Sequence, residues 1–258
     1  MLAAAAVTAA IAGWWGPAFA TMNPADLSPA NQAIFTTNHL KLITEPTTLT
    51  YDFEKKGTME EGFSDTVEAD VNNIQDSGKK DIAFRFLTGE HYIDFPPYPA
   101  VTGNPISVLF LERDVQDMQR LTGGNALYFR KQILNALAGT AEVKPVTFTH
   151  DGREYKGTEI RVQPYVHADL VDRFPRFEYK VYVFVLSDEI PGGYYKVSAM
   201  TPGPSEDAPL TYEAVTFHGT KKLGSGKAEA KPASKEDTSK TDATAVADRK
   251  RDEASPKN

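Results

Sequence analysis

The sequence contains no cysteine among its 258 residues. This absence excludes a disulfide scaffold, a cysteine-ligated zinc or iron–sulfur site, a cysteine nucleophile and an acylated lipoprotein, which needs a cysteine after its signal. A basic excess is also missing, because the formal net charge is −7. An acidic balance argues against a general nucleic-acid binder, so we expect no nucleic-acid partner.

Recognisable catalytic and metal-binding motifs are missing as well. The sequence has no GxSxG elbow, and its five histidines show no HExxH or HxH spacing. We therefore expect no enzyme, no cofactor and no metal site. One alternative remains open: Glu68 and Asp70 share a face of an expected strand, about 7 Å apart. Such a pair suits a calcium ion or a glycosidase, but the ordinary interpretation is a solvated strand face.

Residues 1 to 20 form an uncharged, alanine-rich stretch that ends in Ala-Phe-Ala and contains both tryptophans of the chain. Small residues just before a cleavage point are typical of a secretory signal, so we predict cleavage between Ala20 and Thr21. The alternative is a membrane anchor, which needs about 20 predominantly apolar residues. Together with the missing cysteine, the signal predicts export to a bacterial periplasm.

Residues 219 to 258 contain no aromatic side chain, and Lys, Glu, Asp, Ser, Thr and Ala dominate them. A segment of this composition buries too little apolar surface to offset the entropy of ordering it, so we predict a disordered tail. Its 10 basic and 7 acidic residues give it a net charge of +3. We expect either a solvated tail or peripheral contact with anionic surfaces.

Between these ends, residues 21 to 218 are predicted to form a β-rich body. Apolar side chains alternate with polar ones at residues 49 to 53, 63 to 71 and 82 to 86, which indicates an antiparallel meander. The Pro-rich stretch 94 to 105 cannot lie in a central strand. Strands resume at residues 143 to 149, 155 to 162, 176 to 187, 194 to 201 and 210 to 217.

A helical insert is predicted at residues 112 to 138. Val115, Met118 and Leu121 recur at helical spacing, and a Gly-Gly pair ends that helix. Asn125 caps a second helix. The apolar run 106 to 111 just before the insert is predicted to be a buried strand.

The order of elements predicts an α+β fold of mostly antiparallel strands. In one architecture a curved sheet or half-barrel wraps around the central two-helix insert. In the alternative, two small β-sandwiches, residues 40 to 111 and 143 to 218, are joined by the helical pair. The first layout is similar to that of many periplasmic lipid and lipoprotein carriers, although no motif in the sequence identifies such a family.

These features favour a periplasmic, non-enzymatic binding or carrier protein for an apolar or amphipathic ligand, with a lipid-like ligand or another envelope protein as partner. The alternative function is an envelope assembly or interaction module. The predicted ligand-binding residues come from the apolar faces of the helices and from an anion or headgroup site at the start of the second helix. Others come from residues 92 to 101, a loop whose aromatics and prolines suit ligand recognition but also suit covering the end of a sheet. They are Val115, Met118, Phe129, Arg130, Ile133, Tyr92, Phe95 and Tyr98.

Overall fold

The computed structural model describes residues 27 to 223, except 167, 170 and 206. Nine strands form one antiparallel sheet in the order β4-β3-β2-β1-β9-β8-β7-β6-β5. The strands are β1 (Thr47–Lys56), β2 (Phe63–Asn72), β3 (Lys80–Phe86), β4 (Tyr98–Val101), β5 (Glu142–His150), β6 (Arg153–Val162), β7 (Val181–Leu186), β8 (Tyr194–Thr201) and β9 (Thr211–Lys222).

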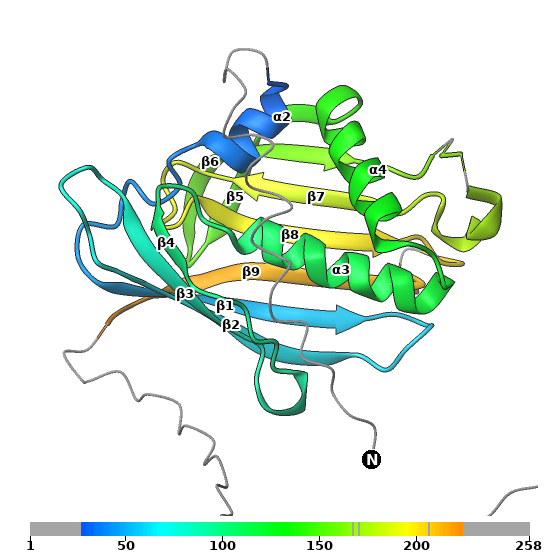
Figure 1. Ribbon diagram of the computed structural model, residues 1–258, viewed down its shortest axis with the longest axis horizontal. Coiled ribbons are helices and arrows are strands. Elements are labelled where there is room, and N and C mark those ends of the chain that lie inside the picture. Colours follow the sequence, from blue (N-terminus) through cyan, green and yellow to red (C-terminus); the bar gives the residue numbers. More distant parts are fainter. Residues whose placement is uncertain (1–26, 167, 170, 206, 224–258) are drawn as a thin grey trace, which may run out of the picture. The chain divides into compact units, whose positions relative to one another are not determined.

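Helices lie on one face of this sheet (Figure 1). The two long ones are α3 (Ile106–Thr122) and α4 (Ala126–Gly139). The short ones are α2 (Pro29–Asn31), the π-helical turn η2 (Gln32–Thr36) and the 3-10 turns η3 (Gly89–His91), η4 (Val171–Arg173) and η5 (Pro175–Phe177). In the described part of the chain, no helix is long and apolar enough to cross a membrane.

The predicted curved sheet around a helical pair is confirmed, and the alternative of two separate sandwiches is wrong. The reason is the central strand β1, which pairs with β2 on one side and with β9 on the other. Leu49, Tyr51 and Phe53 of β1 are each at most 1% exposed, as their alternation predicted. They pack in one hydrophobic cluster with the inner residues of both helices.

The predicted strand at residues 106 to 111 is wrong, because this run forms the first turns of α3. The Asn104 Oδ1 atom accepts a hydrogen bond from the backbone N–H of Ile106 (3.1 Å), which supports the helix start. The apolar residues of this run are buried, because α3 packs against both the sheet and α4. They are Ile106, Leu109, Phe110 and Leu111. A helix covered on several sides carries a continuous apolar run, which periodicity alone does not distinguish from a buried strand.

The turn between the helices agrees with the sequence prediction. Gly123 ends α3 with φ of 67°, a left-handed conformation that favours glycine. The Asn125 side chain accepts a hydrogen bond from the Leu127 N–H (2.8 Å) and so caps α4. The helical insert therefore extends from 106 to 139 rather than from 112 to 138.

Two strand boundaries differ from the prediction. Of residues 176 to 187 only Val181–Leu186 form a strand, because the neighbouring β6 ends at Val162, opposite Tyr182. The residues before it instead form the turn η5. At the other end, β9 continues to Lys222, so residues 219 to 222 belong to the sheet and not to the predicted tail. The predicted export signal and the remaining tail lie outside the described residues.

Candidate functional site

The apolar faces of α3 and α4 meet the sheet in a filled interior. Val115 and Met118 of α3, and Phe129 and Ile133 of α4, are each 0% exposed. All four belong to the same hydrophobic cluster. The structure therefore brings the four predicted helix residues together in the core, and Phe129 also lines a cleft at its edge.

The three predicted loop aromatics are not brought together on one exposed surface. Tyr92 is 48% exposed, whereas Phe95 is buried and packs edge-on against Phe86, with ring centroids 5.4 Å apart. Tyr98 is half-buried on the edge strand β4 and contacts Phe84. Burial raises the pKa of Tyr98 to about 12. Phe95 and Tyr98 thus cover an end of the sheet, and only Tyr92 presents much of its ring to solvent.

Ionic contacts hold α3 against β7 and β9. The Asp114 carboxylate lies 2.6 Å from Lys180 Nζ and accepts a hydrogen bond from Tyr182 Oη (2.6 Å). Burial, followed by the charge of Asp114, raises the pKa of Tyr182 well above its usual range. Arg113 Nη1 lies 2.6 Å from Glu213 Oε2.

A second group of charges joins the same helix to β1. Asp117 of α3 contacts Lys55 of β1 (3.2 Å) and Arg113 (3.2 Å). Burial alone would raise the pKa of Asp117, but the charges of Arg113, Lys55 and Arg120 lower it to about 2. The helix α3 is therefore fixed to several strands by charges as well as by apolar packing.

Polar contacts of α4 run to other helices and to the N-terminal segment. Arg130 Nε donates to Glu112 Oε2 of α3 (2.7 Å), and Arg130 Nη2 also pairs with Glu112. Ser28 Oγ donates to the backbone oxygen of Leu137 (2.8 Å). The structure thus places the Arg130 guanidinium against Glu112, between the two helices. Its predicted part in an anion or headgroup site at the start of α4 stays a prediction.

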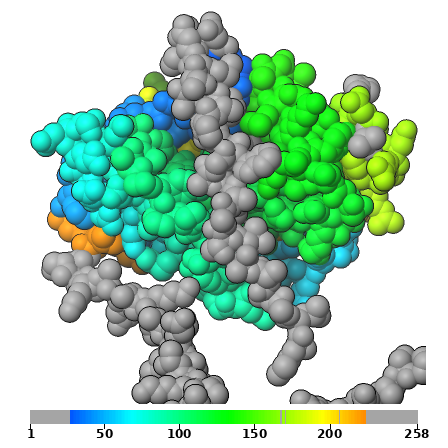
Figure 2. Space-filling model, in the orientation of Figure 1, coloured from blue at the N-terminus to red at the C-terminus, as the bar shows by residue number. Residues whose placement is uncertain are grey.

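A cleft of about 480 Å³ opens at the turn between α3 and α4. The turn and the segment around 171 to 180 (yellow-green) lie beside each other in Figures 1 and 2. Phe129 and Phe174 form its apolar side, with ring centroids 5.4 Å apart. The other lining residues are Gln119, Thr122, Gly123, Gly124, Asn125, Tyr128 and Arg173.

Sequence reasoning missed Arg173 and Phe174. Neither residue belongs to a motif, and both come from a loop more than 40 positions beyond the helix turn that they meet. The cleft adjoins the interior of the protein, since Phe129 and Phe174 belong both to its lining and to the core.

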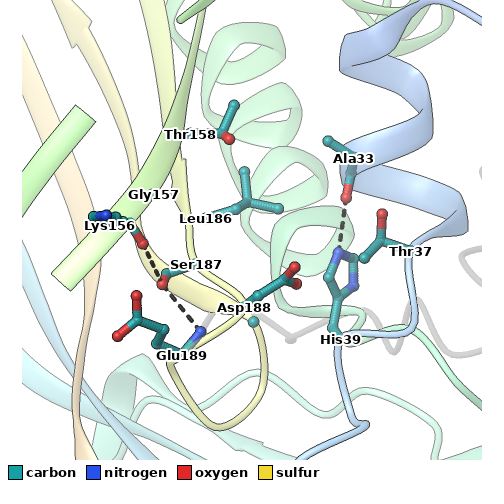
Figure 3. Close-up of a pocket in the computed structure, with 11 residues that line it drawn as sticks. Ala33, Thr37, His39, Lys156, Gly157, Thr158, Leu186, Ser187, Asp188 and Glu189 are labelled. Atoms are coloured by element: carbon teal, nitrogen blue, oxygen red, sulfur yellow. Dashed lines mark hydrogen bonds between the residues drawn. The ribbon is translucent and has the colours of Figure 1, made fainter. Parts of the chain in front are cut away.

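A second cavity, of about 400 Å³, lies between the N-terminal segment and the turn after β7 (Figure 3). His39 on its wall has Nε2 2.7 Å from the Ala33 oxygen, while its Nδ1 accepts from the Asn104 N–H (3.2 Å). Only a neutral ring satisfies both contacts, and burial lowers the pKa of His39 to about 4. Ser187 Oγ donates to the Lys156 oxygen (2.6 Å). Both acidic groups of this cavity are also paired within the protein, Asp188 with Lys41 and Glu189 with Arg153. We place the candidate site at the first cleft, which two aromatic rings of the core line.

Glu68 and Asp70 lie on the solvated face of β2. Both carboxylates pair with Arg85, and Glu68 also pairs with Lys221. Among the described residues, no group of three or more potential protein ligands surrounds a metal position. The geometry of this acidic pair is that of surface salt bridges.

Comparisons with known proteins give little similarity. No protein-family model matches the sequence, and no curated protein matches it. Among solved structures, the chain is similar to the lipoprotein LppX of Mycobacterium tuberculosis, with a TM-score of 0.30, 8% identity, and coverage of 76% of this chain and 94% of that one. It is also similar to a LolA superfamily protein from Nitrosomonas europaea, with a TM-score of 0.20, 10% identity and the same coverage, 76% and 94%.

Proposed function

We propose that this chain is a non-enzymatic, exported binding protein that receives an apolar or amphipathic ligand between α4 and the sheet. The observation that carries the proposal is the unequal attachment of the two helices. Nine residues of α3 are buried, but only four residues of α4. Charges fix α3 to the strands, whereas α4 lies on the core through apolar side chains.

The energies of displacing α4 and of binding a lipid chain are similar. Separating Phe129, Ile133 and Leu137 from the core costs roughly 5–9 kcal/mol, at about 1.5–3 kcal/mol for each buried side chain. An acyl chain of roughly ten methylene groups gains about 8 kcal/mol when it enters an apolar environment. A ligand of this size therefore replaces the contacts that α4 gives up, and the filled interior is compatible with a carrier.

The arrangement of ionisable groups supports binding rather than catalysis. Asp114 is paired with Lys180, and Glu112 with Arg130, so these buried carboxylates have structural partners. Glu68 and Asp70, the enzymatic alternative in the sequence, form solvated salt bridges. None of these contacts faces the candidate cleft.

The first test is native mass spectrometry of protein purified from the exported fraction, followed by organic extraction. We expect a non-covalent adduct of a few hundred daltons and a lipid in the extract. A folded, exported protein that carries nothing, and that also fails to bind added lipids in the second test below, would contradict the proposal.

A second test locates the ligand with a tryptophan reporter. A chain that begins at Thr21 has no native tryptophan, because both lie at positions 14 and 15. We would place one indole by Tyr128→Trp, in α4 next to Phe174, and the control by Tyr92→Trp on the exposed loop. Titration with dodecanol or laurate should shift the emission of Tyr128→Trp alone. A shift only in Tyr92→Trp would place the ligand at the loop and contradict the proposed site.

A further inference from the structure

We propose that the cleft at the α3–α4 turn is the headgroup end of the ligand site, and that Arg173 selects single-chain amphiphiles with an anionic head. This inference rests on the proposed function and adds to it the chemical class of the ligand. The inference rests on three features: the cleft itself, its apolar side formed by Phe129 and Phe174, and the cation Arg173 at its rim. The lining residues come from two segments that lie far apart in the sequence.

The apolar wall leads from the cleft into the core. Phe129 is 0% exposed and Phe174 is 6% exposed, yet both line the cleft. Behind them, Tyr165 packs edge-on against both rings, with centroids 5.7 and 5.8 Å away. An acyl chain that displaces α4 near Phe129 therefore passes from the cleft along aromatic rings of the core, while the Tyr165 hydroxyl stays bonded to Tyr182. The cleft volume of about 480 Å³ lies in the range of small-molecule sites.

The cation at the rim is Arg173, and its charge is not used elsewhere. In the described part of the chain, the side chain of Arg173 takes part in no ion pair and no hydrogen bond, and it is exposed. Arg130, by contrast, is held by Glu112. An unpaired guanidinium beside an apolar wall fits the carboxylate or phosphate of an amphiphile, because it presents several N–H donors in one plane.

The remaining rim groups suit the same headgroup. Gln119, Thr122 and Asn125 add polar side chains, and no acidic residue lies in the first turn of α4. The amino-terminal end of a helix also carries a partial positive charge. Among the residues that line the cleft, Arg173 is the charged one, while the exposed Asp172 precedes it in η4 without lining the cleft. A cation beside an apolar wall matches the two ends of an anionic amphiphile.

The experiment compares three ligands that share one chain length and differ only at the head: laurate, dodecyl phosphate and dodecanol. Their affinities are measured by isothermal titration calorimetry for the wild type, for Arg173→Gln and for Arg176→Gln. Arg176 is the matched control, because it is an exposed arginine of the same loop that does not line the cleft.

We expect the wild type and Arg176→Gln to bind both anionic ligands on the order of fivefold more tightly than dodecanol, the factor for an exposed ion pair. Arg173→Gln should bind all three with similar affinity, and 0.5 M salt should reduce the preference in the wild type. A preference for only one anionic head would identify carboxylate or phosphate as the ligand chemistry and support the inference.

The failures of the two proposals are distinguishable. If all three ligands bind the wild type equally, or if Arg173→Gln keeps the anionic preference, the assignment of Arg173 is overturned while the carrier function stands. If none of the ligands binds to the lipid-free wild type, the carrier function itself is contradicted.

Discussion

At the scale of single residues, the stability of the molecule depends on buried charges that cannot lose a partner. Asp114 and Lys180 are each about 3% exposed, and Tyr182 also bonds to the Asp114 carboxylate. Removing one member of such a pair leaves the other charge buried without compensation, which costs far more than the pair contributes when intact. The position of α3 on the sheet is therefore sensitive to either residue.

We predict that Lys180→Met lowers the free energy of unfolding by roughly 3–5 kcal/mol, because it leaves the Asp114 carboxylate buried without a partner of opposite charge. Urea denaturation measures this change. The control is Lys144→Met, whose partner Glu159 lies 3.0 Å away on the surface, and whose loss should cost at most about 1 kcal/mol. The double variant Lys180→Met with Asp114→Asn should recover part of the loss. Equal, small effects of both lysine substitutions would contradict a structural ion pair at Asp114.

His39 makes stability depend on pH. Burial lowers the pKa of its ring from 6.5 to about 4, so the unfolded chain binds this proton more readily than the folded chain does. The contribution of the neutral ring is complete above pH 6.5 and is lost as the pH falls towards 4, by about 3 kcal/mol in total. Chemical denaturation of the wild type and of His39→Gln at several pH values measures it. The stability difference between the two proteins should narrow as the pH falls, and a constant difference would exclude His39 as its source.

Some residues of the candidate site could be predicted from the sequence, and others could not. Helical spacing predicted that Val115, Met118 and Phe129 share apolar faces, and all three are fully buried. Spacing did not predict that Arg130 meets Glu112, 18 positions earlier, or that Arg173 borders the helix turn. Periodicity reports which face of an element is apolar, but the neighbour of that face depends on the tertiary fold.

At the scale of elements, the two helices differ in how much apolar surface they bury. Nine buried residues hold α3, and four hold α4. This burial also explains why the strand predicted at residues 106 to 111 was wrong. A helix buried along several sides has an apolar run that resembles that of a core strand. The amphipathic α4 was predicted to within one residue, because one of its faces remains in solvent and preserves the helical period.

We predict that the amides of α4 exchange with solvent at least about tenfold faster than those of α3, a factor that corresponds to about 1.4 kcal/mol of local opening free energy. Hydrogen exchange read out by mass spectrometry resolves peptides from each helix. Binding of laurate should slow the exchange of α4 and leave that of α3 nearly unchanged. If α3 opens as readily as α4, the unequal attachment of the helices does not govern access to the interior.

At the scale of the whole described unit, the sheet joins the early and late parts of the sequence. β1 pairs with β2 over nine residue positions and with β9 over ten. The two β-rich halves that the sequence suggested, 40 to 111 and 143 to 218, therefore share a continuous sheet and one core. Local alternation predicted most strands, but the pairing of β1 with a strand about 160 residues later was not available from local patterns.

This pairing predicts that the halves unfold together. Limited proteolysis should leave one resistant core that contains both β1 and β9, because excising either half exposes the hydrogen-bonding edge and the buried face of the other.

Two tryptophan reporters test the same coupling in solution: Phe63→Trp on β2 and Tyr195→Trp on β8, both half-buried in the native protein. In urea, the two indoles should report the same midpoint. Separate midpoints, or two stable proteolytic halves of similar size, would show that β1 and β9 do not couple the halves energetically. The interior beneath α4 would then lie between two independent units rather than within one, and ligand entry by displacement of a single helix would lose its physical basis.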